Sequence, residues 1–451
     1  MADAEGPDPE DPRGPEDPDT TERHATPAGP SGPRATRPPT GPPSSISTGI
    51  IPLGLLLALS VQAAVPPFAT DMYTPAFPAI TVDLSTTATM IGLTLASFFI
   101  GMGAGQIVGG AASDQLGRRG PILVGALVSM AGSLMCMVAP SVPLLIVGRL
   151  LQGLGGGAAG AVARAVVVDL AHGDVLARTM SLMMAITGLA PMIAPIAGGL
   201  VITYTTWRVV FLVLACFGLV MIASAWFVIP ESLPSTSRHR GGMSRFVSGI
   251  GSVLRLRVFV AYMFTSAFSA FCMFAYVSNS SFLLQDQKGL SPLANSLVFA
   301  MNASGQVVFT LVNSRLVGWM RPRRLMAVGL GLSAAAVAIV TVCVLALGTP
   351  LVPTVIGFFL LMSGQAFIFG NSSSLALGAA REHAGTASAV MGLVQSTIMG
   401  ISAPLASSGG ATSSVPMVVV MLIGVLGAWA TYLLAGWLTR RDGGAPRVPS
   451  V

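Results

Sequence analysis

Long apolar segments follow one another from Thr48 to Leu438, and short polar joints separate them. A helix needs about 20 mainly apolar residues to cross the hydrocarbon core of a bilayer. Counting at that length predicts twelve spans. They are residues 49–78, 87–111, 120–139, 143–168, 178–203, 207–229, 256–285, 291–317, 324–347, 351–379, 385–408 and 415–438. Only 9% of the residues are charged, whereas a soluble domain carries about 25%. We therefore expect an all-α membrane protein in contact with the lipid bilayer.

The spans fall into two groups of six. A basic segment rich in Ser and Gly, residues 231–255, divides them into an N-terminal six-helix bundle (48–230) and a C-terminal six-helix bundle (256–438). Residues 1–47 are rich in Pro, Gly, Asp and Glu, a composition typical of a disordered tail. They lack the basic and apolar regions of a signal peptide. Residues 439–451 form a second short tail.

Basic residues predict the orientation in the membrane. If residues 1–47 lie inside, the inner joints and the C-terminus hold fifteen of them: Arg118, Arg119, Arg178, Arg238, Arg240, Arg245, Arg255, Arg257, Arg321, Arg323, Arg324, Arg381, Arg440, Arg441 and Arg447. The outer joints hold two, Arg208 and Lys288. Cytoplasmic loops carry the excess of Lys and Arg, so both termini are predicted to be cytoplasmic. The net charge of +6 reflects this rule better than it indicates a nucleic-acid partner.

Asp71 and Arg149 are the two charges well inside predicted spans. At 1.5 Å per residue both lie roughly 10 Å below the outer end of their helix. Ionisable residues at membrane depth indicate function, and an acid beside a fixed cation can couple proton flow to transport. The sequence permits the two to interact. Alternatively, Asp71 only caps a break caused by Pro66 and Pro67, and Arg149 is an interfacial anchor.

The joint after the second span carries a cluster of charge, Asp114, Arg118 and Arg119, around a turn at Gly117. These side chains can form an ion-pair network at the cytoplasmic face. On charge alone, a turn with basic anchors explains them as well. Two faces of small residues, Gly101, Gly105 and Gly109 in one span and Gly153 and Gly157 in another, favour close helix packing.

Four segments, taken together and in this order, resemble the Bcr/CflA type of drug:proton antiporter in the major facilitator superfamily. They are residues 71–80 (DMYTPAFPAI), 109–119 (GGAASDQLGRR), 148–158 (GRLLQGLGGGA) and 188–199 (GLAPMIAPIAGG). In the last segment Ala194 stands before Pro195 where the family pattern usually has Gly. Residues 163–170 resemble the stretch that closes the fourth helix of that group.

The resemblance implies a major facilitator fold in a bacterial inner membrane, with drug efflux driven by the proton gradient and no cofactor. It implies an antiporter motif at Gln152, Gly153, Pro191, Pro195, Gly198 and Gly199, proton coupling at Asp71 and Arg149, and a cytoplasmic-gate motif at Asp114, Gly117, Arg118 and Arg119. Bicyclomycin and chloramphenicol exporters belong to this group, so antibiotic resistance is the implied activity and a small, neutral drug the implied substrate.

A drug cavity is expected between the bundles near the bilayer midplane. Candidate lining residues are Tyr73, Phe98, Phe271, Tyr276, Asn279, Gln365 and Asn371, although residues of these kinds pack in cores more often than they bind ligands. The four Cys are isolated within apolar runs, and no metal site is expected. We expect a functional monomer without a catalytic centre. A proton-coupled importer and a non-transporting membrane sensor are the alternatives.

Overall fold

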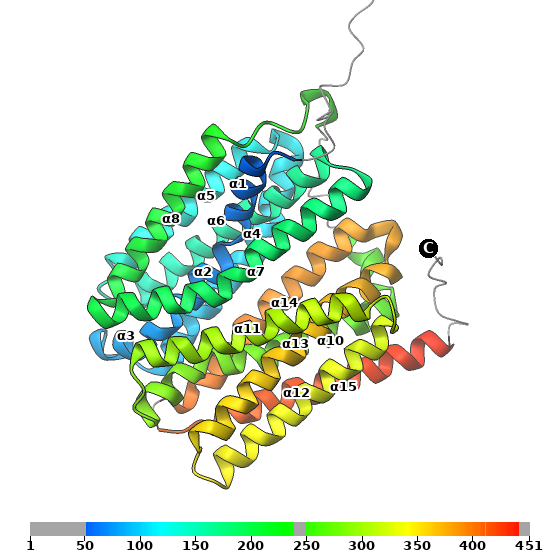
Figure 1. Ribbon diagram of the computed structural model, residues 1–451. Helices are drawn as coiled ribbons and strands as arrows, with labels where there is room; N and C mark the ends of the chain where they lie inside the picture. Colours follow the sequence, from blue (N-terminus) through cyan, green and yellow to red (C-terminus); the bar gives the residue numbers. More distant parts are fainter. Residues whose placement is uncertain (1–50, 239–248, 411, 442–451) are drawn as a thin grey trace, which may run out of the picture. The chain divides into compact units, whose positions relative to one another are not determined.

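The computed structural model describes residues 51–238, 249–410 and 412–441, which form helices joined by short turns (Figure 1). Within these residues there is no β-strand. The expected tail 1–47 lies outside the described residues, as does part of the segment 231–255. Of the expected tail 439–451, residues 439–441 continue the last helix and the rest lies outside the described residues. The assignment of these parts to tails and a linker therefore stays a prediction.

The helices keep the order that the apolar segments predicted. The N-terminal half contains α1 (Leu53–Ala63), α2 (Val65–Asp71), η1 (Thr74–Ala76), α3 (Phe77–Asp83), α4 (Ala88–Leu116), α5 (Arg119–Met137), α6 (Val142–Leu170), α7 (Gly173–Tyr204) and α8 (Trp207–Phe227). The C-terminal half contains α10 (Arg257–Ser281), η3 (Phe282–Gln287), α11 (Pro292–Leu316), α12 (Pro322–Leu345), α13 (Leu351–Ala379), α14 (Ala384–Ala406) and α15 (Val415–Arg441). Short 3-10 turns, η2 (Ser235–Ser237), η4 (Arg381–His383) and η5 (Ser407–Gly409), complete the described elements.

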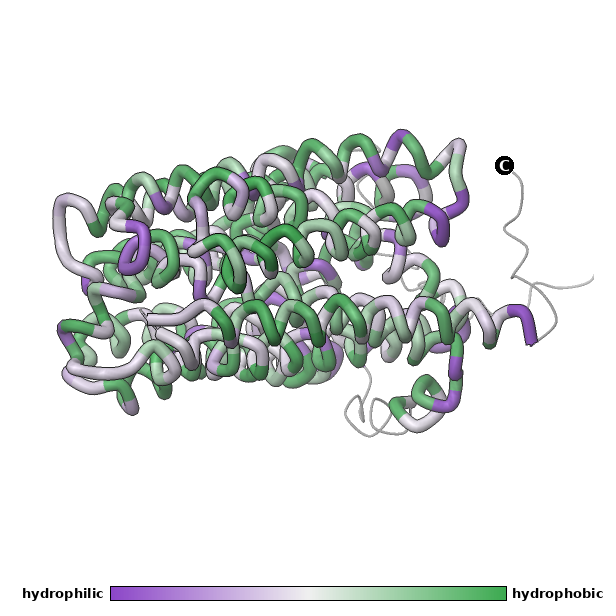
Figure 2. The backbone as a smooth tube through the Cα atoms, turned by 90° about the horizontal axis from the view of Figure 1, so that it is seen from below, coloured by the Kyte–Doolittle hydropathy of each residue, from purple (hydrophilic) through white to green (hydrophobic). Residues whose placement is uncertain are grey.

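Within residues 51–238, 249–410 and 412–441, eleven helical segments are long and apolar enough to cross a membrane, and a bent pair accounts for the twelfth span. The bent pair is α1 followed by residues 65–83, with a bend of 46°. Pro66 and Pro67 cause the break, because neither can donate a backbone hydrogen bond to the preceding turn. The predicted all-α fold with twelve spans is thus confirmed. In Figure 2 the helices are mainly hydrophobic along their length, as lipid contact requires.

The two predicted glycine faces meet each other between α4 and α6. A methyl group added to Gly105 would collide with the carbonyl of Leu154, and one added to Gly153 would collide with the carbonyl of Phe98. The two helix backbones therefore touch along this line. In the N-terminal half α5 also packs on α6 and α8; in the C-terminal half α12 packs on α13 and α10 packs on α13, α14 and α15.

The two halves meet through two helix pairs, α4 with α14 and α7 with α11. A methyl group on Gly92 would lie 2.7 Å from the Cα of Pro404, which shows how closely α4 approaches α14. Near α3, the side-chain amide of Gln285 donates to the carbonyl of Pro75 at 3.0 Å. The halves are therefore in direct contact at the end that the charge bias places outside the cell.

Candidate functional site

Asp71 is the last residue of α2, and its side chain is half-buried. The helix stops here because Pro75 follows within one turn and restricts the residue before it; the chain continues as the 3-10 turn η1. The hydroxyl of Thr70 donates to the Asp71 carboxylate at 3.0 Å. The break thus holds an acid in the middle of the first span, with part of its surface still accessible.

Arg149 lies in α6 and is completely buried. Its Nη1 donates to the carbonyl of Ala69 at 2.8 Å and to Oε1 of Gln152 at 2.6 Å. The guanidinium is also placed between two aromatic rings, 4.5 Å from the centroid of Tyr73 and 4.4 Å from that of Phe98. Such cation–π contacts strengthen when water is excluded, so the rings stabilise a charge that burial would otherwise penalise.

The broken helix explains why a carbonyl is available to Arg149. The backbone amide of Tyr73 donates to the carbonyl of Thr70 at 3.2 Å. In a regular α-helix it would donate to the carbonyl of Ala69, four residues earlier. The Ala69 carbonyl therefore lacks its usual helical donor, and an unsatisfied buried carbonyl is costly. Arg149 supplies the missing donor two residues before Asp71, so it fixes the shape of the chain that carries the acid.

The expected pair of Asp71 and Arg149 does not form an ion pair here. Among the described residues the ion pairs are Arg118–Asp114, Arg118–Asp169, Arg208–Asp83 and Arg238–Glu231. In this state the Asp71 carboxylate instead has the hydroxyl of Thr70 as its side-chain hydrogen-bond partner. Nε and Nη2 of Arg149 have no hydrogen-bond partner in the part of the chain that the structure describes. A direct Asp71–Arg149 bond stays a prediction for another state of the protein.

Gln152, in the predicted antiporter motif, completes a buried hydrogen-bond chain. Its Oε1 accepts from Arg149 and its Nε2 donates to the hydroxyl of Ser133 on α5 at 2.8 Å. Because both ends of the amide are bound, Gln152 orients Arg149 and connects it to a third helix. Gly153 follows directly and allows α4 to approach, as described above.

Tyr276 is the centre of a buried cluster in the C-terminal half. Its hydroxyl accepts a hydrogen bond from the side-chain amide of Asn302 at 2.8 Å. Its ring stacks on Phe299, with centroids 5.3 Å apart, and lies 4.4 Å from the ring of Phe358. Oδ1 of Asn302 is buried without a partner. The C-terminal half therefore presents an aromatic wall and, within the described part of the chain, a hydrogen-bond acceptor without a partner.

The other predicted cavity residues divide between the two halves. Tyr73 and Phe98 lie against Arg149, and the Tyr73 hydroxyl is 2.7 Å from that of Thr94. Gln365 accepts from Ser269 at 2.6 Å, and its Nε2 is unpaired. Both Asn279 and Phe271 are buried in α10.

Asn371 is engaged elsewhere. Its Nδ2 donates to Asn313 of α11 at 2.8 Å and to the carbonyl of Phe367 in its own helix. The structure therefore gives it helix-packing partners and does not bring it next to Tyr276. Sequence reasoning missed Asn302 and Asn313. A usable signal was present, because three asparagines, at 295, 302 and 313, interrupt the apolar span 291–317.

The motif in the fifth span faces the break in the first. A methyl group on Gly198 would collide with the backbone of Met72, and one on Gly199 would meet the side chain of Ser296 on α11. Pro191 and Pro195 lie inside α7, upstream of both glycines. This part of α7 thus packs simultaneously against the residue after Asp71 and against the opposite half.

The cluster at the joint after α4 is centred on Arg118. Its guanidinium bonds Asp114 at 2.5 Å and Asp169, at the end of α6, at 2.7 Å. Burial lowers the pKa of Arg118, but the two carboxylates outweigh it and hold the pKa above its ordinary value. The Arg118 amide donates to Glu231 at 2.7 Å, so the network joins α4, α5 and α6 to the segment after α8. Neither Asp169 nor Glu231 belongs to the predicted gate motif, so the structure adds both to this network.

Gly117 and Arg119 complete this joint. Gly117 has φ +95, a conformation that favours glycine. Arg119 donates to the carbonyl of Trp226 and lies over its ring at 5.5 Å. The partners found for this joint belong to the N-terminal half and the segment that follows it, so a contact between the two halves at this motif stays a prediction.

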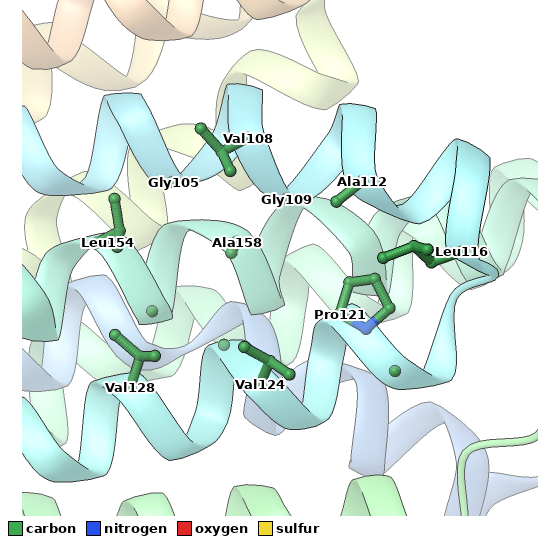
Figure 3. A pocket seen from close by; sticks show the side chains of 13 residues that line it. Gly105, Val108, Gly109, Ala112, Leu116, Pro121, Val124, Val128, Leu154 and Ala158 are labelled. Carbon is green, nitrogen blue, oxygen red and sulfur yellow. The ribbon is translucent and has the colours of Figure 1, made fainter. Parts of the chain in front are cut away.

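A hollow of about 300 Å³ lies elsewhere on the N-terminal half (Figure 3). Its lining side chains come from α4, α5 and α6, among them Val108, Leu116, Val124 and Leu154. The lining contains none of the predicted site residues. Its surface is almost wholly apolar, as expected of a face turned toward lipid tails, so we do not assign the substrate to it.

The family model described as the Major Facilitator Superfamily matches residues 59–404. The chain belongs to this superfamily and is a multi-pass membrane transporter. It is 32% identical over 388 residues to an uncharacterized MFS-type transporter, YdgK, of Bacillus subtilis, covering 85% of this chain and 96% of that protein. This membership confirms the prediction of a transporter rather than an enzyme.

Two further relatives carry names that refer to drug resistance. The bicyclomycin resistance protein homolog of Haemophilus influenzae is 28% identical, over 81% of this chain and 92% of that protein. The multidrug resistance protein MdtL of Salmonella paratyphi C is 30% identical, over 73% and 82%. The resemblance drawn from the motifs is therefore confirmed.

A solved structure shows the same fold. A bacterial homolog of the human lysosomal transporter Spinster, in an inward-facing and unoccupied conformation, superimposes with a TM-score of 0.69. It is 17% identical and covers 87% of this chain and 98% of its own. The predicted major facilitator fold is thereby confirmed.

Proposed function

We propose that this transporter exports a small, neutral drug or antibiotic metabolite across the bacterial inner membrane in exchange for protons. The observation that carries the proposal is the position of Asp71. It is an acid in the middle of a broken span, half-buried and without an ion-pair partner among the described residues. The turn η1, which follows it, packs on α10 of the opposite half.

In this scheme protonation of Asp71 and drug binding compete. A carboxylate in a poorly hydrated site gains from either a proton or a hydrogen-bond donor. A drug in the cavity would place a donor on Asp71 and its apolar part on the aromatic wall around Tyr276. Once the drug leaves on the outside, a proton takes its place on Asp71, and the neutral acid allows the empty site to turn inward.

Arg149 sets the electrostatics of the site without neutralising Asp71 directly. Its Nε and Nη2, which have no partner among the described residues, can donate hydrogen bonds to the carboxylate when the drug is absent. A buried cation also disfavours a second positive charge nearby, because charges interact strongly where water is excluded. This argues for a neutral substrate, and the names of the bicyclomycin and multidrug resistance relatives are compatible with antibiotics such as chloramphenicol.

We further propose that the chain acts as a monomer with both termini in the cytoplasm, and that the Asp114–Arg119 joint gates the cytoplasmic side. The motif in α7, where Gly198 and Gly199 contact the first span and α11, favours antiport over import. The alternative is a membrane sensor that does not transport. Measured transport by the purified protein would exclude this alternative.

Transport by purified protein in proteoliposomes tests the proposal. Vesicles containing the wild type should release protons when a drug gradient drives exchange. Asp71→Asn should reduce this flux at least tenfold, because an amide cannot carry a proton between the two sides, and Asp71→Glu should retain part of it. The matched control is Asp174→Asn, which removes an exposed acid at the start of α7 and should transport normally.

Undiminished proton-coupled flux in Asp71→Asn, with normal insertion, would remove Asp71 from the coupling mechanism. Direction separates export from import. Inverted membrane vesicles should accumulate the drug when their interior is acidified, and accumulation only in right-side-out vesicles under the physiological gradient would indicate an importer.

A further inference from the structure

Each half has a pair of arginines at the start of its third span, and the two pairs differ in their ion-pair partners. Arg118 and Arg119 open α5, the third span of the N-terminal half, and Arg323 and Arg324 open α12, the third span of the C-terminal half. Arg118 has two carboxylate partners, Asp114 and Asp169. In the C-terminal half neither arginine takes part in any of the ion pairs found among the described residues.

The two halves differ at the position four residues before the first arginine of each pair. Asp114 stands four residues before Arg118, and the residue four before Arg323 is Trp319. The Trp319 side chain is 91% exposed. Arg323 instead lies over the ring of Tyr432 at 4.9 Å, and its Nε is buried without a hydrogen-bond partner. Among the described residues, the charge that neutralises Arg118 inside the protein therefore has no counterpart at Arg323.

The end of α15 brings more positive charge to the same place. A methyl group on Gly436 would collide with the guanidinium of Arg323, so the start of α12 lies directly on the last turns of α15. Arg440 and Arg441 follow and are exposed. Arg441 lies over the ring of Trp437 at 5.1 Å.

We call this region the C-terminal basic surface, formed by Arg321, Arg323, Arg324, Arg440 and Arg441 with Trp319 and Trp437. We propose that it binds the head group of an anionic phospholipid. Guanidinium groups bind phosphate through paired hydrogen bonds, and basic surfaces between helix ends bind anionic head groups. Tryptophan is the residue typical of the head-group level.

The apolar surroundings favour a lipid over a free phosphate. Leu433 and Leu434 are exposed on α15, two turns before Arg440 and Arg441, at 60% and 48%. Val328, one turn after Arg324 on α12, is 45% exposed. Acyl chains below a head group held by the arginines would lie along these side chains, whereas a soluble anion would leave them in contact with other lipids.

Lipid binding to the purified full-length protein in detergent tests this inference, whatever the transported substrate is. Native mass spectrometry would count bound phosphatidylglycerol and phosphatidylcholine across a lipid titration. The test variant is Arg324→Gln with Arg441→Gln. The matched control is Arg178→Gln with Arg381→Gln, which removes two exposed arginines from α7 and from the α13–α14 joint.

We expect the wild type to prefer phosphatidylglycerol and the test variant to bind it about 25-fold more weakly, since each arginine near an anionic surface contributes roughly a fivefold effect. The control variant should bind within about twofold of the wild type. Trp319→Ala should weaken binding less than the double substitution does. High salt should weaken binding to the wild type, a result that does not depend on any variant folding.

Three results would overturn the inference. The first is an equal loss in the test and control variants, which would reduce the effect to a general attraction of positive charge. The second is equal binding of phosphatidylcholine and phosphatidylglycerol by the wild type. The third is complete displacement of the lipid by millimolar inorganic phosphate, which would identify a phosphate site without lipid specificity.

Discussion

At the scale of residues, the site depends on one buried cation and the carbonyl that it completes. Arg149 bonds Ala69 and Gln152 and lies between the rings of Tyr73 and Phe98. These contacts leave the Asp71 carboxylate, two residues beyond Ala69, free to interact with a proton or a ligand. Arg149 is therefore a positioning residue for Asp71 in this state of the protein.

Arg149→Lys should separate charge from geometry. A lysine keeps the positive charge but lacks the planar fork that reaches both Ala69 and Gln152 while stacking on the rings. Losing a hydrogen bond to a charged group costs about 1.5–3 kcal/mol, so we expect transport to fall roughly 10- to 100-fold with the protein still inserted. Arg178→Lys, a change of an exposed arginine near the start of α7, is the control. Normal transport by Arg149→Lys would show that charge alone suffices.

At the scale of elements, two local sequence features determine how the helices of the N-terminal half pack. Prolines break the first span and release a carbonyl at membrane depth, and the touching glycine faces of α4 and α6 let the backbones of these helices meet. In a bilayer, helices gain no hydrophobic stabilisation from association, and close packing of small residues takes its place. The glycines of α4 therefore let it pack directly on α6, the helix that carries Arg149 and Gln152.

Two glycines on the same helix test this packing. Gly105→Ala would place a methyl group into the backbone of α6, whereas around Gly110 there is open space within 4 Å. We expect Gly105→Ala to lower the free energy of unfolding by about 1–3 kcal/mol, as overpacking does. Gly110→Ala should be neutral or stabilising by up to about 1 kcal/mol, because alanine favours the helix. Thermal unfolding of both variants in detergent provides the comparison, and equal midpoints would contradict the packing role.

At the scale of the whole molecule, the site is shared between two halves that come from distant parts of the chain. Asp71 and Arg149 belong to one, and Tyr276 and Asn302 to the other. Contacts such as Gln285 with Pro75 close the end predicted to face outward. Opening that end requires the halves to separate there, so a substrate held between them is exposed to one side at a time.

The charge moved in each cycle should be visible in the energetics of transport. Exchange of a neutral drug for one proton carries a net positive charge inward, so a membrane potential should assist export by about 2.3 kcal/mol per 100 mV. Proteoliposomes with a potassium gradient and valinomycin would set the potential independently of pH. Efflux of a chloramphenicol-like compound should respond to both gradients. A preference for quaternary ammonium dyes over neutral antibiotics would contradict this view of the site.

The sequence by itself determined the number, order and approximate limits of the spans, because a hydrocarbon layer of fixed thickness imposes a length and a composition on each helix. It also indicated the break near Pro66 and Pro67 and the two charges at membrane depth, since these features are local or carry a large desolvation cost. The family followed from short motifs read in order along the chain.

Only the tertiary structure decided which groups those charges contact. Arg149 and Ala69 are 80 positions apart, and their bond depends on how far α6 rotates against the broken first span. The same applies to the packing of η1, just after Asp71, on α10, to Arg118 reaching Asp169 and to the exposure of Trp319. Depth in a membrane follows from position along one helix, but the partner of a side chain follows from the packing of several helices, which no single segment specifies.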